Sequence, residues 1–201
     1  MAKAELIHHI HYPAQSDEDL AEMAGRQDNL AFQELANRYI KAIFNFSRQY
    51  MKNKEDAEDT TQETFYKAWK NIRQYQQGKA FRPWLYAIAR NTSLDSIKKK
   101  KALVFSAIQD NENDLAFEET LRDLEPLPDS LFENKTNLEA LTKALESLHP
   151  DQANILILHY RDELTFQEIA EVIGSPMNTV KSWHHRALIK LRRILKEMHH
   201  M

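Results

Sequence analysis

The sequence predicts an all-α protein in which a flexible acidic linker joins two small helical domains, the second with a helix-turn-helix. Three observations lead to this fold class. Apolar residues recur at steps of three and four along most of the 201-residue chain, the period of a helix that is buried on one side. The three glycines fall between helical patterns, and three of the six prolines stand where first turns would begin. Runs of alternating β-branched residues, which are typical of strands, do not occur.

Charge is distributed unevenly along the chain. Residues 110–139 hold ten acidic and two basic side chains, a net charge of −8, which leaves +5 for the rest of a chain whose total is −3. The same stretch contains Pro126 and Pro128 and shows little helical period. We therefore expect a flexible acidic linker at 104–136, between domains at 16–103 and 137–198. This linker could cover the basic surfaces of the domains or serve only as a solvated spacer, and both interpretations stay open.

Composition excludes several classes of protein. The chain has no cysteine, so a disulfide framework and a Cys-based zinc site are both excluded, and a reducing interior is the natural setting. No apolar run approaches the ~20 residues that span a bilayer, and the first residues lack the continuous apolar stretch of a signal peptide. We expect a cytoplasmic protein without membrane insertion.

The first domain begins with a helix start at Ser16, where the sequence SDED supplies an N-cap and an acid three residues later. A helix over 30–51 follows, and its apolar side chains recur on one face that we expect to be buried. These are Phe32, Leu35, Ala36, Tyr39, Ile43, Phe46 and Tyr50.

The next helix, 54–72, has an apolar and an acidic side. At 100° per residue, Asp56, Asp59 and Glu63 lie opposite the apolar stripe. The acids could only keep the helix soluble and favour its N-terminus, or they could form a docking face for a basic partner; periodicity alone favours the first. The apolar stripe consists of Thr61, Phe65, Ala68, Trp69 and Ile72.

A fourth predicted helix starts with Pro83 at its first position and ends in the lysines at 98–101. Aromatic side chains alternate with cations and an amide around its start. This mixture suits single-stranded nucleic acid, because aromatics stack on splayed bases while cations hold phosphates; the alternative is that the aromatics belong to the core. The group comprises Tyr75, Phe81, Arg82, Trp84, Tyr86, Arg90 and Asn91.

The second domain contains the pattern of a helix-turn-helix. Apolar residues from Leu138 to Leu148 form one helical face, and Pro150 opens a further helix. Thr165 and Glu168 form a capping box that starts a helix at 166, and Gly174 ends it with a residue able to adopt positive φ. We expect the small Ala170 where the helices approach and the side chains of Ile169, Ile173 and Val180 between them.

The helix after this turn is strongly basic, since residues 175–196 hold six Lys or Arg and no Asp or Glu. Its N-terminal half is the part that enters a DNA major groove in such motifs. The alternative is a basic amphipathic helix that is solvated or lies on a membrane. The candidates for base or phosphate contact are Thr179, Lys181, Ser182, Trp183, His185 and Arg186, and those for following the backbone are Lys190, Arg192, Arg193 and Lys196.

Three segments, DAEDTTQETFYKAW, FRPWLYAIARNTSLDSIKKKK and LTFQEIAEVIGSPMNTVKSWHHRA, occur in this order. They resemble those of bacterial sigma factors of the extracytoplasmic-function group, over about 30–101 and 138–195. The resemblance implies a non-catalytic subunit of RNA polymerase. In that family the first domain binds the polymerase clamp helices and opens and reads the minus-ten promoter element as melted single strand. The second domain reads the duplex minus-thirty-five element.

The resemblance also implies roles for single residues. Asp59, Gln62, Glu63 and Phe65 match the polymerase-binding helix, which moves the interpretation of the acidic face toward docking. Asn91 matches a position that contacts a flipped-out minus-ten base, with Tyr75 in the neighbouring loop and Trp84 among the aromatic candidates for DNA binding. The matches to minus-thirty-five contacts are Lys181, Ser182, His185 and Arg186.

The chain also departs from the family pattern. Asn178 stands where the family usually has Gly, and Trp183-His184 replace a common Arg followed by an aliphatic residue. His159 stands where some members have a basic residue that contacts DNA. These departures concern which promoter is read. An anti-sigma protein is a further candidate partner, on which the sequence does not decide.

Other classes of protein explain less of the chain. An autonomous helix-turn-helix regulator leaves the aromatic and basic first domain without a role, and a helical scaffold would need an internal repeat that is absent. An enzyme is disfavoured, because no Gly-rich phosphate loop or nucleophile stands out. We expect no cofactor and no metal site, since scattered solvent-facing side chains are the better interpretation of His8, His9, His11, His184 and His185.

Overall fold

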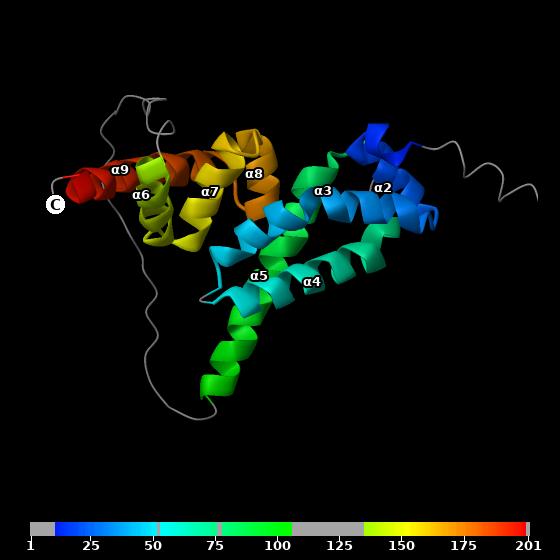
Figure 1. Cartoon of the computed structure of the whole chain (residues 1–201), viewed down its shortest axis with the longest axis horizontal. Coiled ribbons are helices and arrows are strands. Elements are labelled where there is room, and N and C mark those ends of the chain that lie inside the picture. The colour runs from blue at the N-terminus through cyan, green and yellow to red at the C-terminus, as the bar shows by residue number, and fades with distance from the viewer. Residues whose placement is uncertain (1–10, 52, 76–77, 106–134, 200–201) are drawn as a thin grey trace, which may run out of the picture. The chain divides into compact units, whose positions relative to one another are not determined.

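The computed structural model describes residues 11–51, 53–75, 78–105 and 135–199 (Figure 1). Every regular element in these ranges is a helix, which confirms the all-α class. The order is η2 (Tyr12–Ala14), α2 (Asp17–Gly25), α3 (Asn29–Arg48), α4 (Lys54–Asn71), η3 (Ile72–Gln74), α5 (Phe81–Phe105), α6 (Lys135–Glu146), α7 (Pro150–Tyr160), α8 (Phe166–Ile173) and α9 (Met177–His199). Most of the predicted linker, residues 106–134, lies outside the described residues.

The chain divides into two compact units, Met1–Leu94 and Asp95–Met201, and the division falls inside α5. The first unit contains η2, α2, α3, α4, η3 and the first part of α5, and the second contains α6 to α9. The domain limits drawn from the sequence, 16–103 and 137–198, stay predictions.

Side-chain caps fix the starts of the first helices. Ser16 accepts a hydrogen bond from the backbone N–H of Asp19 (3.1 Å), as the sequence predicts for α2. Asp28 caps α3 by accepting from Leu30 and Ala31, and Asn53 caps α4 by accepting from Asp56. Each cap satisfies N–H groups that have no partner inside their own helix, so the boundaries of these helices are set locally.

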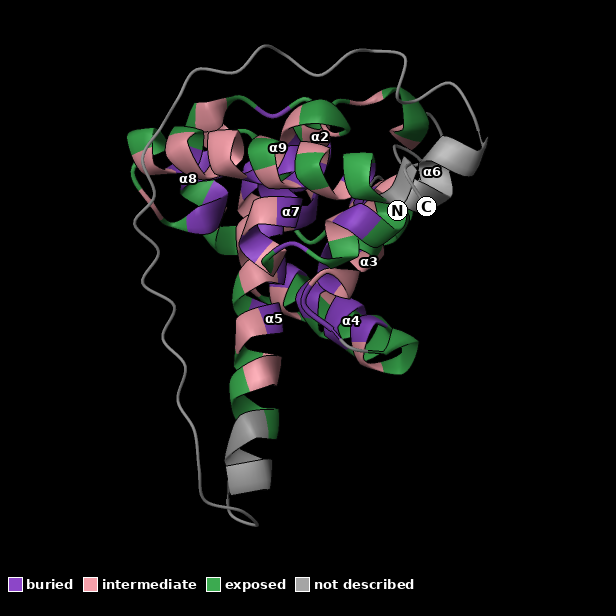
Figure 2. Ribbon diagram, turned by 90° about the vertical axis from the view of Figure 1, so that its left-hand side faces the viewer, coloured by how far each residue is buried: buried purple, intermediate pink, exposed green. Residues whose placement is uncertain are grey.

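The first unit has its core between α2, α3 and α5. Leu20, Leu35 and Ile43 are fully or almost fully buried. The ring of Phe46 in α3 meets that of Tyr86 in α5 edge-on, with centroids 5.1 Å apart. Burying a side chain of this size contributes roughly 1.5–3 kcal/mol, so this layer holds α5 against α3. Figure 2 shows buried and exposed residues on different sides of the helices.

The buried side of α4 is made of small residues, and this corrects the apolar stripe drawn from the sequence. Trp69 is 52% exposed rather than buried. Three threonines can be buried because each hydroxyl donates to the carbonyl four residues earlier, at 2.6–2.7 Å. At ~100° per residue, Trp69 lies about 140° around α4 from Thr64, so its ring is on a different side from these buried residues. The buried residues of α4 are Ala57, Thr60, Thr61, Thr64 and Ala68.

The start of α5 lies two residues before the predicted one, at Phe81 rather than Pro83. A carboxylate oxygen of Glu18, in α2, accepts a hydrogen bond from the backbone N–H of Phe81 (3.1 Å). Since this cap comes from a helix distant in the sequence, the local pattern around Pro83 could not reveal it. α3 differs as well, because it ends at Arg48, before the predicted 51.

The guanidinium group of Arg38 fastens the chain segment before α2 to α3. It donates to the backbone carbonyls of Tyr12, Pro13 and Gln15 at 3.0–3.1 Å. It also donates to the carboxylates of Asp17 (2.7 Å) and Glu34 (2.9 Å). Arginine has five N–H donors, and each of them is used here.

The second unit packs α6, α7 and α9 around one apolar cluster. Its buried members are Ala144, Leu148, Ala153, Leu156, Ala187, Leu191 and Leu195. α8 completes the predicted helix-turn-helix, because the capping box of Thr165 and Glu168 is present and Gly174 has a φ of 68°. The side chains of Ile169, Ile173 and Val180 are buried between the helices, as expected.

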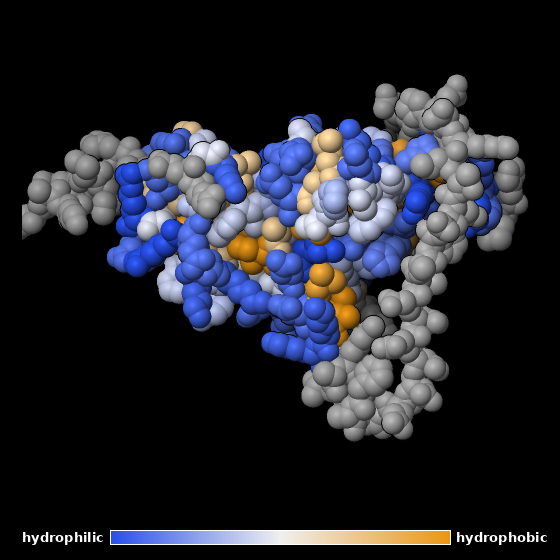
Figure 3. Space-filling model, turned by 180° about the vertical axis from the view of Figure 1, so that it is seen from behind, coloured by the Kyte–Doolittle hydropathy of each residue, from blue (hydrophilic) through white to orange (hydrophobic). Residues whose placement is uncertain are grey.

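The face of the molecule that Figure 3 shows is mostly hydrophilic where its residues are described. Figure 3 shows one face of the molecule, where hydrophobic residues form only small patches. No helix in the described ranges combines the length and the hydropathy that crossing a bilayer requires.

Candidate polymerase and nucleic-acid interfaces

The acidic side of α4 is open to solvent. Asp59, Gln62 and Glu63 are all exposed, on the side away from the buried threonines. Glu63 lies 3.9 Å from the ammonium of Lys67, one turn along the helix, and such an exposed pair contributes little to stability. These side chains are therefore accessible to a partner.

Phe65 does not join this group. It is half-buried, and at ~100° per residue it lies about 120° around α4 from Asp59. Two other aromatic side chains take its place on the open side, Tyr66 (55% exposed) and Trp69 (52% exposed). With Asp59 and Gln62 they follow a spacing of three and four residues, which could have been found in the sequence. We call Asp59, Gln62, Tyr66 and Trp69 the outer stripe of α4.

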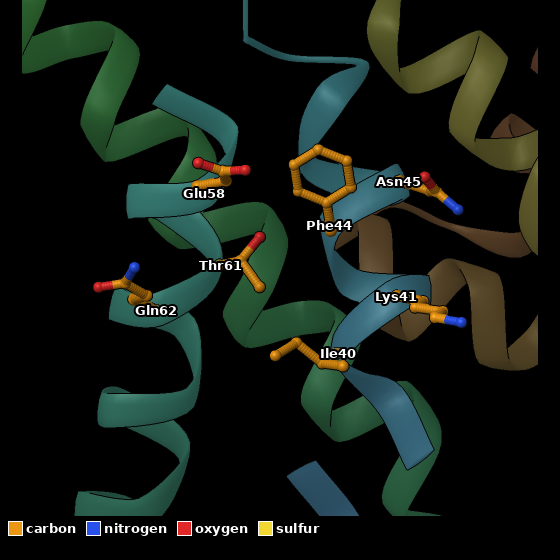
Figure 4. A pocket seen from close by; sticks show the side chains of 7 residues that line it. All are labelled: Ile40, Lys41, Phe44, Asn45, Glu58, Thr61 and Gln62. Atoms are coloured by element: carbon orange, nitrogen blue, oxygen red, sulfur yellow. The ribbon is translucent and has the colours of Figure 1, made fainter. Parts of the chain in front are cut away.

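A groove lies beside the outer stripe, between α3 and α4, with a volume of about 410 Å³. In Figure 4, Ile40 and Phe44 of α3 point toward Thr61 of α4, whereas Lys41 and Asn45 point away. Ile40 is 51% exposed. The groove thus adds apolar surface next to the acidic and aromatic residues of α4. Its lining residues are Ile40, Lys41, Phe44, Asn45, Glu58, Thr61 and Gln62.

Tyr75, Phe81 and Trp84 form an aromatic cluster at the start of α5, with ring centroids 5.5–5.9 Å apart in each pair. Phe81 is buried, so it is a core residue, whereas Tyr75 and Trp84 are only partly buried. The hydroxyl of Tyr75 donates to the carbonyl of Lys79, which holds the tyrosine across the loop. The cluster therefore has a buried base and two rings that reach the surface.

A second polar link organises the same region. The hydroxyl of Tyr39 in α3 donates to the carboxylate of Asp17 in α2 and accepts from Nε of Arg82 in α5 (3.4 Å). Burial, together with the hydrogen bond to Asp17, raises the pKa of Tyr39 to about 12, although Arg82 opposes the shift. Tyr39 therefore stays protonated and joins three helices at the base of the aromatic cluster.

Asn91 is exposed on α5. It follows Trp84 by seven residues, so the two side chains lie on the same side of the helix, about two turns or ~10 Å apart. The structure therefore brings Tyr75, Trp84 and Asn91 to one region of the first unit. A stacked base and a base read by an amide could both be accommodated along this side of α5.

In the second unit, α9 carries the sequence candidates on its accessible side. Lys181 is exposed. The Ser182 hydroxyl donates to the backbone carbonyl of Asn178 at 3.0 Å. Thr179, Ser182, His185 and Arg186 are all partly exposed.

Lys181 and Arg186, which the sequence groups as candidates for the same contacts, lie on different flanks of α9, whereas Arg186 stays within about 40° of Ser182. At ~100° per residue Lys181 and Arg186 are about 140° apart. The ammonium of Lys181 lies 6.0 Å from the ring centroid of Phe166, in α8, whereas Nε of Arg186 is shielded from solvent. Ser182 and His185 lie between the two flanks. A duplex facing Ser182 would therefore have one cation on each side.

His184 lies on the inner side of α9, among aromatic rings. It contacts His159, Tyr160 and Phe166 with ring centroids 5.1–5.6 Å apart. Burial, reinforced by the neighbouring His159 and His185, lowers the pKa of His184 to about 4. Nδ1 of His159 lies 3.0 Å from the carbonyl oxygen of Leu164, which can only accept, so this nitrogen carries a proton. Both histidines thus act as packing groups between α7, α8 and α9.

The described part of the chain contains no group of three or more His, Cys, Asp or Glu side chains that could hold a metal ion. His11 is exposed in this part, and His8 and His9 lie outside it.

Both halves of the chain match models of known protein families. Residues 35–103 match Sigma-70 region 2, and residues 138–191 match Sigma-70, region 4. The first match contains α4 and most of α5, and the second contains the helix-turn-helix. Together the two matches cover more than half of the chain.

Individual relatives are similar along most of their length. The chain is 29% identical over 176 residues to the ECF RNA polymerase sigma factor SigW of Bacillus subtilis, which covers 87% of this chain and 92% of that relative. It is 28% identical over 163 residues to the RNA polymerase sigma factor YlaC of the same species, covering 81% and 91%. Among solved structures, the sigma factor RpoE in complex with the anti-sigma factor NepR from Bartonella quintana aligns with a TM-score of 0.64 at 25% identity, covering 82% of this chain and 96% of that one.

These matches agree with the order of the three sequence segments and with the exposed faces on α4 and α9. The chain belongs to the extracytoplasmic-function group of the sigma-70 family: it is a sigma factor that binds core RNA polymerase and directs promoter-specific transcription initiation, and it is not an enzyme.

Proposed function

We propose that the two units divide promoter recognition between them. The domain at 16–103 binds the clamp helices of the polymerase through the outer stripe of α4, with Glu63 and the partly buried Phe65 beside it. The same domain opens the minus-ten element. The domain at 137–198 reads the minus-thirty-five element. The observation that carries this proposal is the basic, accessible side of α9. This helix follows α8, which starts with a capping box and ends in a tight turn at Gly174.

Minus-ten binding is assigned to Tyr75, Trp84 and Asn91. Two partly exposed rings beside a buried one offer a stacking surface, and an amide on the same side of α5 can hydrogen-bond a base. The minus-thirty-five contacts are assigned to the N-terminal half of α9. The residues are Thr179, Lys181, Ser182, His185 and Arg186.

Run-off transcription with purified core polymerase and a genomic promoter pool tests this division. The wild-type protein should produce transcripts from a small set of promoters. A variant with both Lys181→Ala and Arg186→Ala should still bind core polymerase but lose that selection. If the protein instead bound duplex promoters tightly and specifically without polymerase, an autonomous regulator would be the better description.

We further propose that the protein works in the cytoplasm, where core polymerase is found, and that an anti-sigma protein controls it. The second proposal is supported by the solved complex of RpoE with NepR, at 25% identity to this chain. A protein purified with this factor from its native cells should block its run-off transcription, and should not block transcription directed by a different sigma factor. A partner that leaves transcription unchanged would contradict anti-sigma control.

A further inference from the structure

We propose that Asn178 reads an adenine in the minus-thirty-five element through its side-chain amide. This inference rests on the proposed role of α9 as the helix that enters the major groove. It adds to that role a residue, Asn178, that the family motif does not include, since the family usually has glycine at this position.

The position of Asn178 on α9 is the first support. Asn178 is the second residue of the helix, and its side chain is exposed. At ~100° per residue, Asn178, Ser182 and His185 fall within about 60° of one another. They lie opposite the buried side chains of Val180 and Ala187. Asn178 therefore occupies the centre of the outward face, at the end that reaches deepest into a groove.

The hydrogen bonds around Asn178 are the second support. Its backbone carbonyl accepts from the hydroxyl of Ser182 at 3.0 Å, so the hydroxyl hydrogen of Ser182 is used inside the helix. The side-chain amide of Asn178 makes no hydrogen bond within the described ranges. Both the amide oxygen and the amide nitrogen are therefore available to a base.

The chemistry of the neighbouring side chains indicates which base. Lys181 and Arg186 carry donors only, and so suit guanine or phosphate. An adenine edge presents an N6 donor next to an N7 acceptor, and recognition of both needs an acceptor and a donor on one side chain. An asparagine amide has this pair in the right geometry. Asn178 thus gives the outward face of α9 a side chain that can recognise an A·T base pair.

The test is holoenzyme binding to every single-base-pair variant of the preferred minus-thirty-five element. The wild type, Asn178→Ala and Asn178→Asp are compared. Asn178→Ala should remove the preference for A·T at one position, a loss of roughly 5- to 150-fold in discrimination, and should leave the other positions unchanged. Asn178→Asp should favour cytosine at the same position, because a carboxylate accepts from N4 of cytosine. A purely structural role of Asn178 would not produce this change of base.

Arg186→Ala is measured as well. It distinguishes a failure of Asn178 as a base-reading residue from a failure of α9 as the base-reading helix. If Arg186→Ala alters base preference and neither Asn178 variant does, α9 is the reading helix and Asn178 does not read a base. If no variant alters preference at any position, the proposed role of α9 fails as well. Uniform weakening by Asn178→Ala across all sequences would also overturn the inference, since it indicates a backbone contact or a damaged helix start. Thermal unfolding of both Asn178 variants shows whether the start of α9 is damaged.

Discussion

Glu18 and Phe81 are 63 residues apart in sequence, yet Oε1 of Glu18 accepts the backbone N–H of Phe81 at 3.1 Å. Phe81 is the first residue of α5, the helix that carries Trp84 and Asn91. A side chain of α2 therefore sets where this helix begins, and with it the placement of the proposed minus-ten site.

Replacing Glu18 by Ala should lower the free energy of unfolding by about 1–2 kcal/mol, because the N–H of Phe81 loses its cap. Glu18→Gln, which keeps an acceptor oxygen, should recover most of this loss. Urea unfolding measures both. Glu22→Ala is the matched control, since Glu22 in the same helix forms an ion pair with the exposed Arg26, and its effect should stay within about 0.5 kcal/mol. Equal effects of Glu18→Ala and Glu22→Ala would contradict the capping role.

Reversing Asp59 and Glu63 to Lys should weaken binding to core polymerase strongly, through like-charge repulsion, while the helicity measured by circular dichroism stays unchanged. Both side chains are exposed, so the fold does not depend on them. The control is the double variant Glu146→Lys and Glu197→Lys, which changes the net charge equally at exposed positions of the second unit. Unchanged affinity of the Asp59 and Glu63 variant would remove the docking role of α4.

Truncating Tyr66 and Trp69 to Ala should weaken polymerase binding by ~1–3 kcal/mol for each side chain, as for aromatic residues at the centre of an interface. Stability should change by less than ~0.5 kcal/mol, because both rings are more than half exposed in the free protein. Affinity for core polymerase and urea unfolding are measured on the same samples. A large loss of stability without a loss of affinity would show that these rings support the fold instead.

Asn91→Ala should slow open-complex formation and relax the minus-ten preference, while binding to core polymerase is spared. The reason is that an exposed amide which reads an extruded base contributes only after the strands separate. Permanganate footprinting of melted thymines measures opening. Asp95→Ala, one turn further along α5 and also exposed, is the control. Opening by Asn91→Ala at the wild-type rate and selectivity would exclude the base contact.

The second unit should lose stability as the pH falls from about 6.5 to 4. The folded protein holds the pKa of His184 at about 4, below the ordinary value of 6.5, so the unfolded chain binds the proton first. The loss should be about 1–3 kcal/mol, nearer the lower figure because the ring is partly exposed. Chemical unfolding at pH 7.5 and pH 5 measures it. His184→Phe should flatten this dependence, whereas His185→Gln should weaken it only slightly, because burial is the main cause of the lowered pKa of His184.

Local patterns predicted the helix-turn-helix well, and distant contacts explain what they missed. The capping box of Thr165 and the turn at Gly174 depend on atoms only a few residues apart, so the sequence contains them directly. The start of α5 depends on Glu18, which no local window includes. Trp69 was misplaced because it was grouped with its neighbour Ala68, although the spacing of three and four residues puts it with Asp59, Gln62 and Tyr66 on the exposed side.

The same distinction holds for the candidate sites. Trp84 and Asn91 are seven residues apart, a spacing that puts both on one side of α5 and can be read from the sequence. Lys181 and Arg186, five residues apart, were grouped together although this spacing turns them to opposite flanks. The family motif predicts only the acids beside Tyr66, whereas the spacing of three and four residues also includes Tyr66 itself.

Arg38 has a practical consequence for dividing this protein into fragments. Three of its five donors bind carbonyl groups at Tyr12, Pro13 and Gln15, before the helix that begins with the Ser16 cap. A fragment cut at Ser16 would keep every α-helix of the first unit and still lose these three acceptors, so part of the half-buried guanidinium group would have no hydrogen-bond partner in the protein. A fragment of the first unit made for binding studies should therefore begin no later than His11. A tag joined directly at Ser16 would disturb the same contacts.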